Sequence, residues 1–182
     1  FGHRVVAECG TLKPIRDHLI DWILLEATMP QTAAFNEVLV DTLERLLGQK
    51  SADAAPIEWT SALREAQHVF VYEVFLYTIA ALLKAEAFDA LRIVFSHPYI
   101  LPASEAYGRD RFANFGAFYG QSDALQVLAS GGRKLKAPAA ELVKRQSDRP
   151  DVPFAALIEA DLLSLMMSFL SKASWYPQLL HY

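Results

Sequence analysis

The chain has 182 residues, which is long enough to bury a hydrophobic core without disulfides or a structural metal. Hydrophobic residues make up 53% of the sequence and charged residues 21%, a balance that excludes wholesale disorder. The net charge of −4 gives no global attraction to nucleic acid or anionic lipid, and a single cysteine excludes an internal disulfide. We therefore expect a soluble protein in a reducing, cytoplasmic setting.

The amino terminus carries neither an initiating methionine nor the apolar core of a signal peptide, because it reads Phe1-Gly2-His3-Arg4-Val5-Val6. The expectation is a single helical domain, residues 1–182, excised from a longer protein.

Apolar residues recur at three- and four-residue steps in the first fifty residues, which predicts two amphipathic helices. The first is expected to begin at Pro14 and to end before Met29-Pro30. The second has Thr32 as a candidate cap, apolar positions from Phe35 to Leu47, and Gly48 as a candidate terminator.

The longest predicted helix covers about residues 60–85. Its second half, Val69 to Leu83, is apolar on every face apart from Glu73, and it is shorter than the ~20 residues that a membrane span needs. We therefore predict a buried central helix and no membrane association. Residues 87–96 follow closely enough to form an antiparallel hairpin with it.

The remaining chain is predicted to contain an irregular stretch and three further helices. Glycines interrupt residues 107–120, where Phe112, Phe115 and Phe118 are expected to turn inward. Helices are predicted over 138–146 and 154–172, and a short one begins near 122. No alternating strand pattern competes, so the predicted fold is all-α, with about six to seven helices in bundle-like or orthogonal packing around the central helix.

One spacing resembles a ribonuclease motif. Arg92-Ile-Val-Phe-Ser-His97 is similar to the Arg-x4-His motif of HEPN ribonucleases, helical proteins whose Arg and His act on RNA at a dimer interface. The resemblance implies that Arg92 and His97 are catalytic, although Ile93 stands where that family usually has a polar residue. The other interpretation is a histidine at a helix end, where it interacts with the helix dipole.

Glu73 is the most unusual single residue, since a carboxylate within an apolar helix must be paired, protonated or directed at a cavity. It is therefore a candidate ligand-binding residue. The structural alternative is an ion pair with Arg92, Arg109 or Arg111.

Basic residues outnumber acidic ones in residues 103–150, whereas the reverse holds in residues 1–100. Tyr107, Arg109 and Arg111 begin a segment that mixes aromatic and basic side chains, which is typical of surfaces that bind nucleotides or single-stranded nucleic acid. The alternative is that the aromatic residues fill the core.

No metal or cofactor is expected. Glu65 and His68 have the Glu-x-x-His step of helical di-iron sites, but a di-iron site requires a second such pair, which the sequence lacks. No Cys/His cluster, glycine-rich phosphate loop or serine elbow is present.

The C-terminal region resembles the closing helix of accessory domains in bacterial conflict and defence proteins. The likeness lies in Phe154-Ala-Ala-Leu-Ile-Glu159-Ala-Asp161 and in Trp175-Tyr176-Pro177. It implies a domain that senses, recruits or braces a neighbouring effector. Glu159 and Asp161 are otherwise polar-face residues of an amphipathic helix.

The sequence thus favours a non-enzymatic interaction or regulatory domain, whose partner is a protein or a neighbouring domain of the same chain. The alternatives are a HEPN-type ribonuclease that uses Arg92 and His97, and a nucleotide- or nucleic-acid-binding module that uses the segment from Tyr107 to Tyr119.

Overall fold

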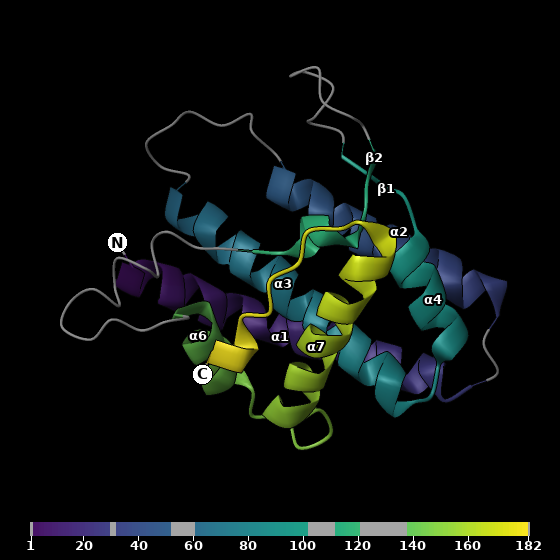
Figure 1. Ribbon diagram of the computed structural model, residues 1–182. Helices are drawn as coiled ribbons and strands as arrows, with labels where there is room; N and C mark the ends of the chain where they lie inside the picture. The colour runs from purple at the N-terminus through teal and green to yellow at the C-terminus, as the bar shows by residue number, and fades with distance from the viewer. Residues whose placement is uncertain (1, 30–31, 52–60, 102–111, 121–137, 182) are drawn as a thin grey trace.

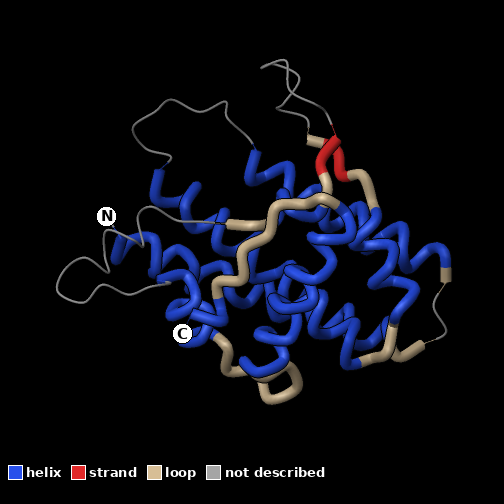
Figure 2. Tube along the Cα trace, viewed as in Figure 1, coloured by secondary structure: helices blue, strands red, loops and turns tan. Residues whose placement is uncertain are grey.

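The computed structural model describes residues 2–29, 32–51, 61–101, 112–120 and 138–181. These residues form six α-helices, two short strands and two 3₁₀ helices (Figures 1 and 2). In chain order the elements are α1 (Gly2–Ala27), α2 (Ala33–Ser51), α3 (Ser61–Lys84), α4 (Phe88–Ser96), β1 (Tyr99–Ile100), β2 (Phe112–Ala113), η2 (Phe115–Phe118), α6 (Pro138–Gln146), α7 (Phe154–Ser171) and η3 (Leu179–His181). The predicted all-α class with bundle-like packing is confirmed.

The central position predicted for the third helix is also confirmed. Every side chain from Val69 to Leu82 is buried, Glu73 included. Four helices pack on α3, namely α1, α2, α4 and α7, and Figure 1 shows α3 passing through the middle of the molecule behind α7. An apolar surface on all sides of a helix requires such a complete enclosure.

Helix α1 differs from the prediction because it begins at Gly2 and passes through Pro14, which was expected to begin it. An interior proline removes one backbone hydrogen bond and costs roughly 3 kcal/mol. The turns before it are held by tertiary contacts: Val5 and Cys9 are buried in a small apolar cluster with Val69 of α3. The Cys9 thiol also donates to the Ala66 carbonyl at 3.8 Å. Burial thus overrides the local signal for a helix start.

Helix α2 begins as predicted and ends later. The Thr32 hydroxyl oxygen accepts a hydrogen bond from the Phe35 backbone N–H at 3.2 Å, as a helix cap does. The helix continues through Gly48 to Ser51, so Gly48 does not terminate it. A Cβ at Gly48 would meet no neighbouring atom, and Leu47 beside it is buried in the core.

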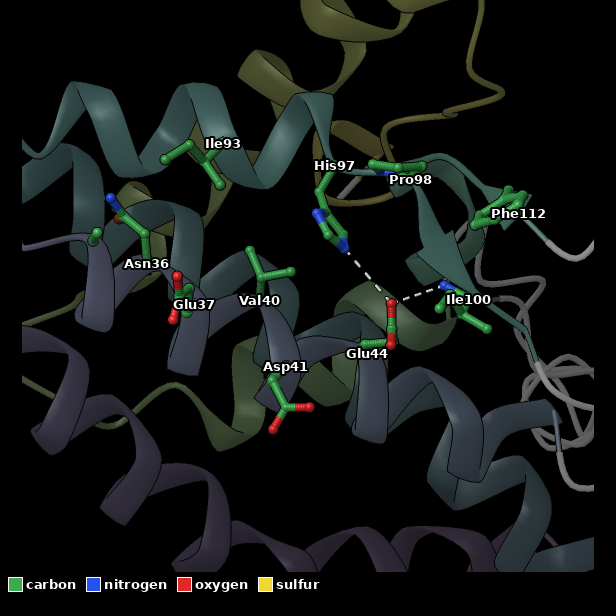
Figure 3. A pocket seen from close by; sticks show the side chains of 11 residues that line it. Asn36, Glu37, Val40, Asp41, Glu44, Ile93, His97, Pro98, Ile100 and Phe112 are labelled. Atoms are coloured by element: carbon green, nitrogen blue, oxygen red, sulfur yellow. Dashed lines mark hydrogen bonds and ion pairs between the residues drawn. The ribbon is translucent and has the colours of Figure 1, made fainter.

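The strand pair is a feature that the sequence does not predict. Tyr99 pairs with Ala113 and Ile100 with Phe112 in antiparallel register. Strands of two residues are too short to produce an alternating apolar pattern. The pair lies beside the end of α4 and brings Phe112 next to that helix end (Figures 2 and 3).

A buried carboxylate joins α7 to α3 and to the C-terminal segment. Asp161 Oδ1 accepts hydrogen bonds from Trp175 Nε1 at 2.9 Å and from the Tyr72 hydroxyl at 3.3 Å, and its Oδ2 accepts from the Leu179 N–H at 2.8 Å. Burial raises the pKa of Asp161, while these donors oppose the shift. Asp161 is therefore a core residue and not a polar-face residue, whereas Glu159 is exposed.

Two helices in the described part of the chain have the length and apolar composition of a membrane span, α3 from Glu65 to Lys84 and α7. Such helices also occur as core helices of soluble proteins, and α3 is mostly buried within this protein. Most of the α7 residues are not buried, and several of its large apolar side chains face outward.

Replacing Leu76 with Ala tests the central position of α3. Leu76 is fully buried, so truncation should lower the free energy of unfolding by about 2–5 kcal/mol through lost apolar contact and a cavity. Urea denaturation monitored by circular dichroism measures the change. The matched control is Leu25→Ala on α1, where the side chain is 58% exposed, and it should stay within about 0.5 kcal/mol of the parent. Equal costs for the two substitutions would contradict the placement.

Candidate functional site

A pocket of about 650 Å³ lies between α2 and α4, beside the strand pair (Figure 3). Its described lining comes from three places in the chain: one face of α2, the last turns of α4 with β1, and one residue of β2. The lining residues are Ala33, Asn36, Glu37, Val40, Asp41, Glu44, Ile93, His97, Pro98, Ile100 and Phe112.

The α2 side of the pocket follows from helical spacing, because successive lining residues are alternately three residues and one residue apart, which keeps them on one face. Val40 lies in the middle of this side and Ile93 of α4 points toward it from above, which makes an apolar centre (Figure 3). Phe112 adds an aromatic side chain that is 61% exposed. Phe112 was expected to turn inward, and that prediction is wrong because the strand pair holds it at the pocket rim.

One end of the pocket is organised by Glu44. Its Oε2 accepts a hydrogen bond from the Ile100 backbone N–H at 2.9 Å and lies 3.6 Å from His97 Nε2 (Figure 3). The His97 ring also packs edge-to-face on Tyr99, with centroids 5.0 Å apart. His97 is the C-cap residue of α4, as the helix-end interpretation predicts. Glu44 therefore fixes the backbone of β1, which follows α4, and also the position of the His97 imidazole.

The other end of the pocket offers hydrogen-bond acceptors. Asn36 Oδ1 is buried and has no hydrogen-bond partner within the described structure, a situation that costs about 1–3 kcal/mol unless a bound group satisfies it. Glu37 lies one residue further along α2 and is exposed. Asp41 is engaged by Arg45 at 2.9 Å on the outer surface. The described lining thus carries three carboxylates and neither lysine nor arginine.

Arg92 is not brought together with His97. Its side chain is 71% exposed and its Nε lies 3.9 Å from Asp89 Oδ1 on the same helix, whereas His97 lines the pocket. Five residues along a helix rotate a side chain to a different face. The Arg-x4-His spacing therefore does not assemble one site within this chain.

Glu73 is paired, but its partner is Arg16 of α1. The Arg16 guanidinium donates through Nη1 to Glu73 Oε1, and Arg16 is itself fully buried. Burial raises the pKa of Glu73 to about 7, and the positive charge of Arg16 opposes that rise. The structural interpretation of an ion pair holds, while the expected partner Arg92 is exposed on another helix. Glu73 is therefore not placed to receive a ligand.

A second arginine extends this charged network toward the surface. Arg149 donates two hydrogen bonds to the Asp151 carboxylate, from Nε at 3.1 Å and from Nη2 at 2.5 Å. Its Nη2 also donates to Asp21 Oδ1 at 2.5 Å. Its Nη1 also donates to the Asp17 backbone carbonyl at 3.0 Å. The carboxylates of Asp17 and Asp21 on α1 thus bind arginine, and no group of three or more His, Cys, Asp or Glu in the described chain could hold a metal ion.

The basic aromatic segment is described only from residue 112 onward, so Tyr107, Arg109 and Arg111 lie outside the described residues. Within the described part, Phe115 and Phe118 are fully buried, and their rings stack on Phe75 with centroids 6.3 Å and 4.6 Å away. Trp175 contacts the same cluster, 5.4 Å from the Phe75 ring. These aromatic residues fill the core, as the alternative interpretation predicts.

Comparison of the chain with known protein families, with curated protein sequences and with solved structures finds no match.

We predict that the purified chain shows no RNA cleavage that depends on Arg92 and His97, since the two side chains occupy different faces. Single-stranded RNA incubated in EDTA is assayed with the parent chain and with the Arg92→Ala, His97→Ala double variant. Metal-independent cleavage by the parent that disappears in the double variant would establish the ribonuclease instead.

Proposed function

We propose that this chain is a non-enzymatic helical interaction domain of a cytoplasmic protein, and that its α2–α4 pocket receives a segment of a protein partner. The observation that carries the proposal is a pocket of about 650 Å³ in which the buried Asn36 Oδ1 has no hydrogen-bond partner among the described residues and the described charged residues are acidic. Such a pocket is suited to a ligand that donates a hydrogen bond to the Asn36 oxygen.

The lining chemistry selects the kind of segment. Asn36 Oδ1 and the Glu37 carboxylate are acceptors, so the best complement is a lysine or arginine side chain, which carries only donors. The apolar stem of that side chain would lie along Val40 and Ile93. Phe112 at the rim offers its ring to a neighbouring apolar residue of the partner. We therefore propose a partner segment that places a basic residue beside an apolar one.

The same chemistry disfavours phosphate groups in this pocket, because three carboxylates would repel them. A nucleotide or nucleic acid therefore fits this site poorly. The resemblance of residues 154–177 to accessory domains of defence proteins supports a sensing or bracing role for the interaction. The resemblance identifies no binding residue, because the Asp161 carboxylate already accepts hydrogen bonds from Trp175 and Leu179 within the core.

Selection of randomised peptides displayed on phage against the 182-residue chain tests this function. Enriched peptides should contain Lys or Arg next to an apolar residue. A synthetic peptide from the selection should bind about tenfold or more weakly to Glu37→Gln and to Asn36→Leu, because each variant removes a charge-assisted or buried hydrogen bond.

The matched control is Glu26→Gln, which removes a carboxylate on α1 outside the pocket lining. It should bind the peptide like the parent. Enrichment of acidic peptides, or equal affinity for the pocket variants and the control, would contradict the proposal.

A further inference from the structure

The outer face of α7 is apolar, and no other part of the described chain covers it. Leu162, Met166, Phe169 and Leu170 are 37%, 64%, 78% and 79% exposed. They follow one another at steps of four, three and one, which places them on one side of the helix, opposite the side that Asp161 anchors to the core. In Figure 1 this helix lies along the near side of the molecule, in front of α3. Adjacent exposed apolar residues of this size mark an interaction surface.

Charged residues of opposite sign lie at the two ends of α7. Glu159 is exposed near the start of α7, one turn before Leu162, and Lys172 is exposed directly after the last residue of the helix. Neither forms an ion pair within the described part of the chain. Between these two residues every exposed position of α7 is uncharged, because Asp161 is buried.

We propose that the α7 face binds the α7 face of a second copy of this chain, with the two helices antiparallel about a two-fold axis. An antiparallel pair brings the start of one helix to the end of the other. Glu159 of each copy would therefore meet Lys172 of its counterpart, twice per dimer, as an isologous interface requires. A parallel pair would instead place like charges side by side.

The apolar positions fit the same arrangement. The midpoint between residues 159 and 172 falls beside Met166, so this side chain lies next to the axis and contacts its own counterpart. Leu162 and Phe169 lie at equal distances on either side and therefore contact each other across the interface. Methionine at the axis suits this position because its unbranched side chain adapts its shape to its neighbour.

This arrangement also distinguishes a second copy from a lipid surface. Insertion of the α7 face into acyl chains would move the Glu159 carboxylate toward an apolar phase that contains no hydrogen-bond donor or cation to compensate for its lost hydration. Dimerisation pairs that carboxylate with Lys172. The proposal involves a different face from the α2–α4 pocket and does not depend on the function proposed for it.

The test is the oligomeric state of the 182-residue chain by sedimentation and light scattering. The parent should show twice the protomer mass of 20.3 kDa. Met166→Asp should be monomeric, since it places two like charges beside the axis. Phe88→Asp is the matched control, because it alters an apolar residue of α4 that is 63% exposed, and it should remain dimeric.

Charge reversal tests the antiparallel arrangement. Glu159→Lys alone and Lys172→Glu alone should each weaken the dimer about tenfold, because each turns two attractions into two repulsions. The double reversal should restore the parental dissociation constant. Failure of that restoration would contradict the antiparallel pairing. A monomeric parent would overturn the proposal, and a monomer whose binding to phosphatidylcholine vesicles is lost in Met166→Asp would assign the face to lipid instead.

Discussion

A carboxylate in the middle of a helix that is buried on every side must be paired with a cation, hydrogen-bonded to donors or protonated. In this chain Arg16 of α1 supplies that cation to Glu73 of α3. The guanidinium also lies 4.6 Å from the centroid of the Tyr77 ring and donates to the Gln146 carbonyl at the end of α6, at 3.4 Å. Because α1, α3 and α6 meet at one fully buried side chain, this group sets how α1 lies along α3. The pocket and the α7 face are built on other sides of the same central helix.

The sequence predicts those parts of the fold whose signals are local and repeated. The apolar run after Val69 marks the central helix, and Thr32 marks the start of α2. Prediction from the sequence fails where tertiary contacts override a local signal. Pro14 predicts the start of a helix, yet α1 begins at Gly2 and continues past Pro14, because Val5 and Cys9 are buried against the core. The two-residue strands carry no periodic signal at all.

The candidate site was predicted only in part, because its residues come from segments that no spacing rule connects. His97 was identified for a motif that the structure does not assemble, and it belongs instead to a pocket with Glu44. Asn36 and Glu44 look like ordinary polar residues of an amphipathic helix, so their position in a pocket beside α4 becomes visible only in three dimensions. Arg16 was missed for a similar reason. Its position beside Pro14 suggests a surface helix start, while its partner lies far along the chain.

The most direct test of this account is a double-mutant cycle on the ion pair, with unfolding measured in urea at pH 8, above the pKa of about 7 for Glu73. Arg16→Met should cost about 3–5 kcal/mol, because it leaves the buried Glu73 carboxylate without its cation. Glu73→Leu should cost less, because Arg16 keeps its hydrogen bonds to the Asp17 carboxylate at 2.7 Å and 3.0 Å. The double variant should recover most of that loss, since it leaves neither charge in the core. Costs that simply add in the double variant would show that Arg16 and Glu73 act independently, and would contradict the central role assigned to their contact.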